Sequence, residues 1–101
     1  LIGNNMGKRY YCQPIKRYVC FLYQYVDNSL KVLMIAHTTG EVLDYITAPF
    51  LSPRKLCAYI DNKTFPWLSD WLVEKGIALP TKRVICEDGF YYFEFKFKKE
   101  I

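Results

Sequence analysis

The lone histidine, His37, is the first side chain to test for catalysis. It follows an apolar run and comes directly before Thr38-Thr39-Gly40, a turn sequence at which a histidine is often merely solvated. No serine or cysteine stands beside it in a recognisable motif, so no catalytic triad can be assembled from the sequence. We therefore expect no catalytic role for His37.

The carboxylates give no better candidate for acid–base chemistry. Turns, helix-capping positions and the solvated face of a helix account for most of them: Asp27, Asp61, Asp70, Glu74, Glu87 and Asp88. Asp44 stands inside a strand-like run, between Leu43 and Tyr45, and is interpreted as an outward-facing position. The glycines are scattered at turns and form no phosphate-binding loop. The sequence therefore predicts a protein that is not an enzyme.

The four cysteines, at positions 12, 20, 57 and 86, do not form a metal-binding pattern. None belongs to a C-x-x-C pair, and a single histidine is too few to complete a usual zinc site. Each cysteine lies in a strand-like run, where a thiol behaves as a small buried hydrophobe. The even number leaves disulfides formally open, but without a secretory signal the economical interpretation is a reducing, cytoplasmic setting. No metal and no cofactor are expected.

Composition excludes further classes of protein. With 51% apolar and 18% aromatic residues, the chain is too hydrophobic for a disordered segment. No apolar run approaches the roughly 18 residues that a membrane span needs, and the first residues lack the order of a signal peptide. A chain of 101 residues suits one domain with one core. We expect a flexible N-terminal segment at residues 1–7 and a single globular domain at residues 8–101.

One segment, Thr64–Gly76, has a convincing helical period. Leu68, Trp71 and Leu72 fall at i, i+3 and i+4 and give one broad apolar face, with a second tryptophan on its flank. Thr64 can cap the start, and Gly76 can adopt the left-handed conformation at the exit. A helix of about ten residues is marginal alone, so we expect its tryptophans to pack on a sheet.

Strand-like segments lie on both sides of this helix. Before it, apolar runs separated by turn residues predict strands over Arg9–Ile15, Arg17–Val26, Leu30–His37, Val42–Thr47 and Leu56–Ile60. A turn at Asn28-Ser29 would place Tyr25 opposite Val32. The stretch Pro49–Pro53 contains two prolines and is expected to leave the sheet.

The last hairpin is the best-specified part of the sequence. Asp88-Gly89 is the two-residue signal for a primed turn, and it places Cys86 opposite Tyr91, Val84 opposite Phe93 and Arg83 opposite Glu94. Arg83 and Glu94 are then expected to form an ion pair across the strands on the exposed face. The aromatic residues of the opposite face are expected to form the core: Tyr91, Phe93, Phe95 and Phe97.

The predicted fold class is α+β. The order of elements gives a strongly twisted antiparallel sheet of about five or six strands packed on one helix. Three strands, a helix and two strands is also the order of an OB-like barrel, which remains an alternative architecture.

Nucleic-acid binding is one functional hypothesis. The formal charge of +4 comes from 14 basic and 10 acidic residues, and several basic residues alternate with tyrosines. A sheet can offer tyrosine rings for base stacking and lysines for phosphates, which here would be Tyr92, Lys96 and Lys98 together with Arg17 and Tyr18. The lysines of the last strand have a second explanation, because charged residues also protect a sheet edge from pairing with another chain.

Protein binding is the leading hypothesis. Strand Arg17–Val26 has more apolar surface than one core needs, so Tyr18, Leu22 and Val26 can remain outside the packed sheet. Tyrosine flanked by arginine is a common composition of interface anchors. The alternative is that Pro49–Pro53 folds over that face and buries it. The candidate binding residues are therefore Arg17, Tyr18, Leu22, Tyr92, Lys96 and Lys98. A protein partner is expected, a homodimer and nucleic acid stay open, and no membrane is involved.

From Leu56 onward the chain resembles a family of small uncharacterised proteins encoded on bacterial phages, plasmids and other mobile elements. The likeness lies in a strand ending in Asp61 and a helix that carries Leu68 and Leu72 and closes on Gly76-Ile77. A connector with Thr81 and Arg83 and the turn Gly89-Phe90 follow. The resemblance implies a mobile-element accessory protein. Some such proteins, anti-CRISPR inhibitors among them, act by occupying the surface of a host protein. The family offers no motif from which a functional residue could be transferred.

Overall fold

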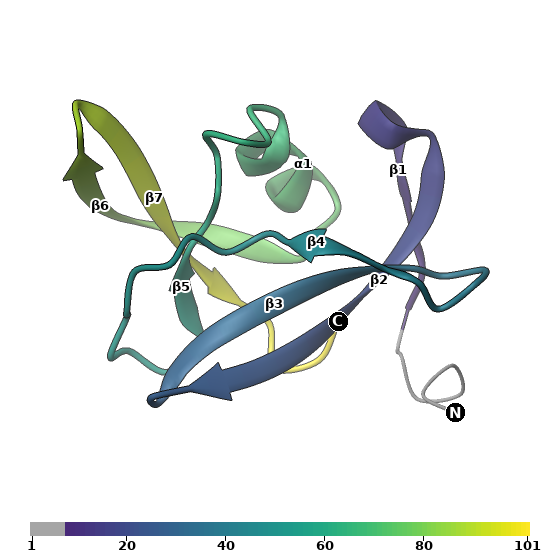
Figure 1. Ribbon diagram of the computed structural model, residues 1–101, viewed down its shortest axis with the longest axis horizontal. Coiled ribbons are helices and arrows are strands. Elements are labelled where there is room, and N and C mark those ends of the chain that lie inside the picture. The colour runs from purple at the N-terminus through teal and green to yellow at the C-terminus, as the bar shows by residue number, and fades with distance from the viewer. Residues whose placement is uncertain (1–7) are drawn as a thin grey trace.

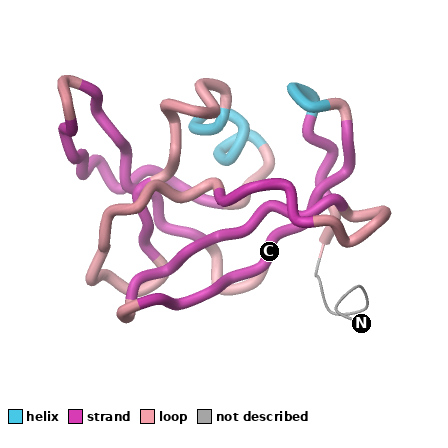
Figure 2. Tube along the Cα trace, in the orientation of Figure 1, coloured by secondary structure: helices cyan, strands magenta, loops and turns pink. Residues whose placement is uncertain are grey.

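The computed structural model describes residues 8–101, and the predicted N-terminal segment 1–7 lies outside the described part (Figures 1 and 2). The elements follow in the order β1 (Tyr10–Cys12), the 3₁₀ helix η2 (Gln13–Ile15), β2 (Arg17–Val26), β3 (Ser29–Ala36), β4 (Val42–Tyr45), β5 (Cys57–Tyr59), α1 (Leu68–Glu74), β6 (Ala78–Glu87) and β7 (Phe90–Phe97). Within this part of the chain no helix has the length and apolar character that crossing a membrane requires.

The strands form two antiparallel sheets, whereas the sequence predicted one. The first sheet has the order β1-β2-β3-β4 and the second the order β5-β7-β6, and residues 8–101 form no closed, OB-like barrel. The second sheet begins after Pro49 and Pro53, which interrupt the pairing. A single bridge between Thr47 and Ile60 connects the two sheets. The α+β character is retained, with more strand and less helix than expected.

The β2–β3 hairpin pairs two residues away from the predicted register. Its turn is Asp27-Asn28, where both residues have positive φ, at 53° and 63°. This primed-turn geometry places Tyr25 opposite Leu30 rather than Val32. Because the shift is an even number of residues, each side chain still lies on the face that the sequence predicted.

Helix α1 buries the apolar face that its period predicts: Leu68, Trp71 and Leu72. They join one main core with Phe95, Phe97 and the inward-facing residues of β2 and β3. The helix begins later than expected, at Leu68, and Thr64 does not cap it. Instead Asp61 Oδ1 accepts a hydrogen bond from the Thr64 N–H, which holds the preceding residues in turns. Gly76 has a φ of +69°, as the helix exit predicts.

The segment Pro49–Pro53 packs against the second sheet instead of burying the outer face of β2. Phe50 meets Tyr92 of β7 edge-on, with ring centroids 4.9 Å apart. Ser52 donates a hydrogen bond to Glu94 in the same strand. Tyr18 and Val26 of β2 remain exposed. The segment thus supplies one of the polar partners that the buried Glu94 carboxylate needs.

The β6–β7 hairpin confirms part of its predicted register. Cys86 pairs with Tyr91, and Val84 pairs with Phe93. The predicted ion pair between Arg83 and Glu94 is wrong, because the register shifts between Pro80 and Val84 at a bulge where Lys82 has a φ of +75°. Glu94 is 1% exposed and pairs with Arg54 instead.

Candidate interaction surface

The β6–β7 hairpin extends beyond the core and forms an arm at the upper left of Figure 1. The inner face of β7 therefore has two environments. Phe95 and Phe97, at 2% and 1% exposure, are buried in the core, whereas Phe93 and Tyr91 are 39% and 56% exposed. The predicted aromatic core is thus correct for two of its four residues. The other two lie on a surface, which Val84 and Cys86 of β6 extend.

We define the arm face as these four exposed residues on the distal half of the hairpin: Val84, Cys86, Tyr91 and Phe93. The helix is too short to cover them. Seven helical residues span about 10 Å, whereas the eight residues of β7 span about 26 Å. This difference in length is the signal in the sequence that could have placed Tyr91 and Phe93 outside the core.

A recess of about 210 Å³ separates the arm from helix α1. Phe93 and Phe95 line it on the arm side and Val73 on the helix side. The other lining residues are Ser69, Asp70, Pro80, Lys82, Arg83 and Glu94. Val73 is exposed although its neighbour Leu72 is fully buried. The recess is therefore mainly apolar, with Lys82 and Arg83 at its edge.

The side-chain amide of Asn62 connects the arm to the body by two hydrogen bonds to the backbone of β7. Asn62 Nδ2 donates to the Tyr91 carbonyl at 3.0 Å, and Asn62 Oδ1 accepts from the Phe93 N–H at 3.3 Å. The Ile60 N–H donates to the Phe93 carbonyl at 2.9 Å. On the opposite face of the arm, the Lys63 ammonium lies 5.7 Å from the centre of the Phe90 ring. These hydrogen bonds hold the backbone of the arm at Tyr91 and Phe93 against the body.

Glu94 places a buried carboxylate beside the recess. Its oxygens accept hydrogen bonds from the hydroxyls of Ser52 at 2.7 Å and Thr81 at 2.5 Å, and from Arg54 Nη1 at 3.3 Å. A charge at 1% exposure is tolerated because these donors replace water. The cluster joins three separate segments of the chain: the residues between the two sheets, β6 and β7.

A second recess, of about 310 Å³, lies on the other side of helix α1, between the helix and η2. Trp67 and Trp71 line it with their rings perpendicular, at 88° and 5.9 Å between centroids. Asp70 and Glu74 line it too and are both exposed. Asp70 also lines the recess beside the arm, so the helix carries one continuous surface between the two recesses.

No family model, curated protein or solved structure matches this chain. The geometry of the described residues therefore carries the functional argument.

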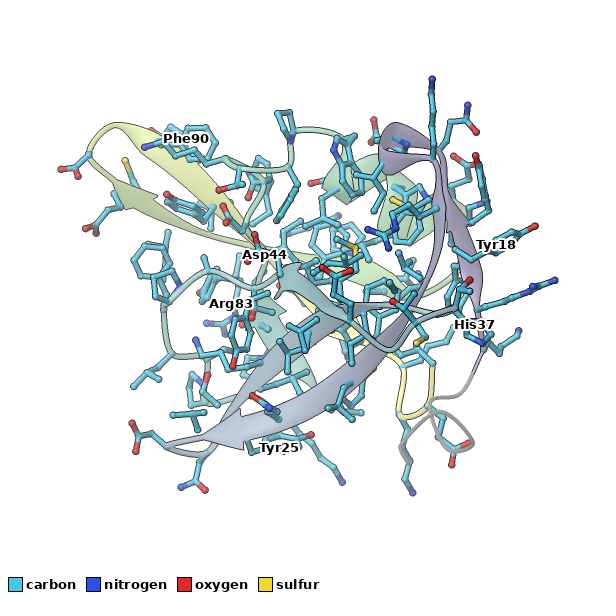
Figure 3. All side chains as sticks on the ribbon, turned by 45° about the vertical axis from the view of Figure 1, so that its right-hand side comes forward. Tyr18, Tyr25, His37, Asp44, Arg83 and Phe90 are labelled. Carbon is cyan, nitrogen blue, oxygen red and sulfur yellow. The ribbon has the colours of Figure 1, made fainter. Side chains whose placement is uncertain are left out.

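The candidate residues of β2 belong to a different sheet from the arm, and Figure 3 shows Tyr18 on the opposite side of the molecule from Phe90 of the arm. Tyr18 is exposed and contacts Tyr11 edge-on, and the guanidinium of Arg9 lies 4.3 Å from the centre of its ring. Arg17 is 3.7 Å from Glu41. Leu22 is half-buried against the small cluster of Cys20, Leu33 and Ile35.

Of the other predicted binding residues, Tyr92 and Lys96 belong to β7, and Lys98 follows directly after that strand. Tyr92 is half-buried and contacts the rings of both Phe50 and Phe90. Lys96 and Lys98 are exposed and line a recess of about 460 Å³ at the end of that sheet. The structure thus divides the six candidates into two groups. Arg17, Tyr18 and Leu22 lie on β2 of the first sheet, whereas Tyr92, Lys96 and Lys98 lie on or directly after β7 of the second.

The side chains considered for catalysis are dispersed. The His37 N–H donates to the Tyr18 carbonyl beside the start of β2, and Figure 3 shows both residues near one edge of the molecule. Asp44 is exposed, and its Oδ1 accepts a hydrogen bond from the next backbone N–H. Within residues 8–101, no three His, Cys, Asp or Glu side chains lie close enough together to hold a metal ion.

Proposed function

We propose that this chain is a non-enzymatic binding protein and that a partner protein packs on the arm face. One observation carries the proposal: Tyr91 and Phe93 lie exposed side by side on an apolar face, although the hairpin that bears them is fastened to the body by Asn62. Exposing aromatic surface has a free-energy cost, because burying it in a core or an interface is favourable. A fixed aromatic pair of this kind is therefore well suited to a partner that covers it.

The composition of the surface supports the same conclusion. Tyrosine and phenylalanine are enriched at the centres of interfaces, where pockets desolvate fully, and charged residues surround them. Here Tyr91 and Phe93 lie next to a recess that can receive an apolar side chain, and Lys82 and Arg83 provide the polar edge. Because hydrogen bonds already hold the backbone that carries both rings, a partner that binds here need not order that backbone, which lowers the entropic cost of association.

The outer face of β2, with Tyr18 and Leu22, is the second protein-binding surface under this proposal. Single-stranded nucleic acid ranks lower. Base stacking needs open ring faces, whereas Tyr92 is half-buried and contacts the rings of Phe50 and Phe90. The resemblance to mobile-element proteins suggests that the partner is a bacterial host protein, with a defence component such as a CRISPR effector as one candidate.

The proposal is tested by capture from a bacterial lysate, with and without nuclease, read by mass spectrometry. Tyr91→Ser and Phe93→Ser should lose the captured protein, whereas the matched control Tyr25→Ser should keep it, because Tyr25 is equally exposed but lies at the end of the β2–β3 hairpin (Figure 3). Circular dichroism checks that each variant is folded. Equal losses in all three variants would contradict the arm face, and capture that nuclease abolishes would favour nucleic acid. Light scattering would reveal a homodimer as the alternative occupant.

A further inference from the structure

Three lysines surround an apolar recess at the opposite end of β6 and β7 from the arm face. The recess has a volume of about 460 Å³. Its apolar lining includes Leu56, Ala78 and Leu79, and its charges come from Lys96, Lys98 and Lys99. Leu79 pairs with Lys96 across the two strands, so their side chains lie next to each other on one face of the sheet. Leu79 is 62% exposed and leaves a large apolar area beside the charges.

The polar side chains of this lining are all hydrogen-bond donors. An ammonium has three donors and no acceptor, and the other lining residues have no polar side chain. A carboxylate is the complement, because it accepts hydrogen bonds and donates none. A peptide segment fits less well, since its backbone N–H groups need acceptors that these side chains do not offer. The lining therefore favours a ligand with an acceptor-only anionic group and an apolar remainder.

A nucleotide is a poorer ligand for a separate reason. Base binding by proteins of this kind depends on open aromatic ring faces. Phe97 is the aromatic residue of this lining, and at 1% exposure it has no open face to offer. An alkyl chain needs no ring face and is stabilised by contact with the exposed leucine.

The acidic residues near the recess do not neutralise its lysines. The ion pairs within residues 8–101 are Arg17 with Glu41 and Arg54 with Glu94. Glu94 precedes Lys96 by two residues, but its carboxylate is buried and already accepts hydrogen bonds from three other side chains.

Two further carboxylates stand near the lining residues in the sequence. Glu74 precedes Gly76 by two residues and Glu100 follows Lys99, but neither lines the recess. Lys55 and Lys75 directly precede two of the lining residues. The surroundings of the recess are therefore net positive, which favours an anion.

Protection of a sheet edge does not explain Lys96. β7 is the central strand of the second sheet, with β5 on one side and β6 on the other. Lys98 has a structural role of its own, because a methyl group added at Gly76 would lie 3.5 Å from its Nζ, just beyond the C-terminal end of α1, where a cation is favourable. That role does not extend to Lys96, which lies opposite an exposed leucine in the middle of the sheet.

Hydrogen bonds fix the backbone around the recess. The Phe97 N–H donates to the Leu56 carbonyl at 2.7 Å, and the Lys98 N–H donates to the Ile77 carbonyl at 3.2 Å. The Tyr23 hydroxyl donates to the Lys98 carbonyl. Leu56 has a φ of +62°, a costly conformation for a leucine. Residues held in such conformations are concentrated at ligand-binding sites.

We propose that this recess binds a free fatty acid, a function that goes beyond protein binding on the arm face. The carboxylate accepts hydrogen bonds from the lysine ammoniums, and the alkyl chain lies on Leu56 and Leu79. The methylene stems of the lysines can cover the chain while their ammoniums stay in water. The volume of the recess is within the range of small-molecule sites.

The direct test is a titration with octanoate, observed through the amide and methyl NMR signals of Leu56 and Leu79. Two probes separate the contributions: 1-octanol has the same chain without the charge, and butanoate has the same charge with a shorter chain. Octanoate should move the signals in a saturable way. 1-Octanol should bind at least about threefold more weakly and butanoate at least about tenfold more weakly. The proposal is overturned if octanoate does not move the signals or if either probe binds as tightly as octanoate.

One pair of variants tests the charge. Lys96→Gln should weaken octanoate binding about two- to fivefold, because one ammonium is lost from the lining. Lys63→Gln, an equal change of charge at an exposed position beside the arm, should leave binding unchanged. Equal weakening by the two variants would reduce the effect to net charge and overturn the site.

A second pair of variants tests the apolar contact. Leu79 and Leu51 are similarly exposed, at 62% and 59%, and Leu51 does not line the recess. Leu79→Ser should weaken octanoate binding at least about fivefold, whereas Leu51→Ser should not change it. Circular dichroism checks that both variants are folded. Equal binding by the two variants would remove the alkyl chain from Leu79 and overturn the site.

Two controls separate this site from a membrane surface and from the proposed function. Sedimentation with vesicles of phosphatidylcholine and phosphatidylglycerol tests the first. Binding to these vesicles without saturable octanoate binding would assign the lysines to a membrane surface and overturn the fatty-acid site. Tyr91→Ser should lose the captured protein and keep octanoate binding, because Tyr91 lies at the other end of β7. The two proposals therefore fail independently of each other.

Discussion

Ser52 Oγ donates a hydrogen bond of 2.7 Å to Glu94 Oε2 and so fastens the proline-rich segment to the central strand of the second sheet. The two residues are both 1% exposed. The backbone of Ser52 is held as well, because its N–H donates a hydrogen bond to Ser29 Oγ at 3.0 Å. These two hydrogen bonds of Ser52 therefore connect the β2–β3 hairpin, the segment between the sheets and the strand that carries the exposed aromatic residues.

Ser52→Ala should destabilise the protein by about 1–3 kcal/mol, because a buried carboxylate loses one of its donors and no water replaces it. Arg54→Ala should have less effect, about 1 kcal/mol or below, since the Arg54 side chain is 43% exposed and solvent screens its interaction with Glu94. Urea unfolding measures both. Lys55→Ala, at an exposed neighbouring position, is the control and should change little. A larger loss from Arg54→Ala than from Ser52→Ala would contradict this order.

The two aromatic residues of β7 should respond very differently to truncation. Phe97→Ala should cost about 3–5 kcal/mol, because it opens a cavity in the core. Phe93→Ala should cost about 1 kcal/mol, because its ring is 39% exposed and water fills the space that it leaves. Chemical unfolding of the two variants gives the comparison directly. Equal losses would place Phe93 in the core and remove the basis of the arm face.

The sequence predicted β2, β3, β4 and β5 closely because their apolar periods are strong, and it predicted the final turn from Asp88-Gly89. It did not predict η2, which takes the second half of the strand expected at Arg9–Ile15, and it began the helix too early. It did not predict the burial of Glu94, because Ser52 and Arg54, which bind that carboxylate, are distant in the sequence. The residues next to Glu94 give no sign of such a contact. The exposure of Tyr91 was missed for a related reason. Alternation in a strand shows which face is apolar, but the length of the covering element decides how much of that face is buried.

Reactivity of the thiols should distinguish Cys86 from the other three cysteines. Cys12, Cys20 and Cys57 are buried, and burial raises the pKa of each thiol, so little reactive thiolate forms near neutral pH. Cys86 is exposed on the arm face. We expect a thiol reagent to modify one cysteine rapidly in the folded protein and all four after denaturation. Cys86→Ser should abolish the rapid phase; its persistence would show that another cysteine is accessible.

The turn of the β2–β3 hairpin should tolerate glycine and resist alanine. Asn28 has a φ of +63°, a conformation that asparagine and glycine adopt at low cost and other residues do not. Asn28→Ala should therefore destabilise by about 1 kcal/mol, whereas Asn28→Gly should be neutral or slightly stabilising. Thermal or urea unfolding gives the ranking. Equal stabilities for the two variants would contradict the left-handed conformation at Asn28.

Asn62 should control how firmly the arm is held. Asn62→Ala removes the hydrogen bonds to the Tyr91 carbonyl and the Phe93 N–H, and should lower the free energy of unfolding by about 1–2 kcal/mol. Hydrogen exchange is the sharper measurement, because the Phe93 amide should lose protection while the Phe95 amide keeps it. Asn28→Gly serves as a control outside the arm. If the arm face binds the partner as proposed, the loosened arm should also bind it more weakly, since positioning Tyr91 and Phe93 would then cost conformational entropy on association. Unchanged protection of Phe93 would show that other contacts hold the hairpin.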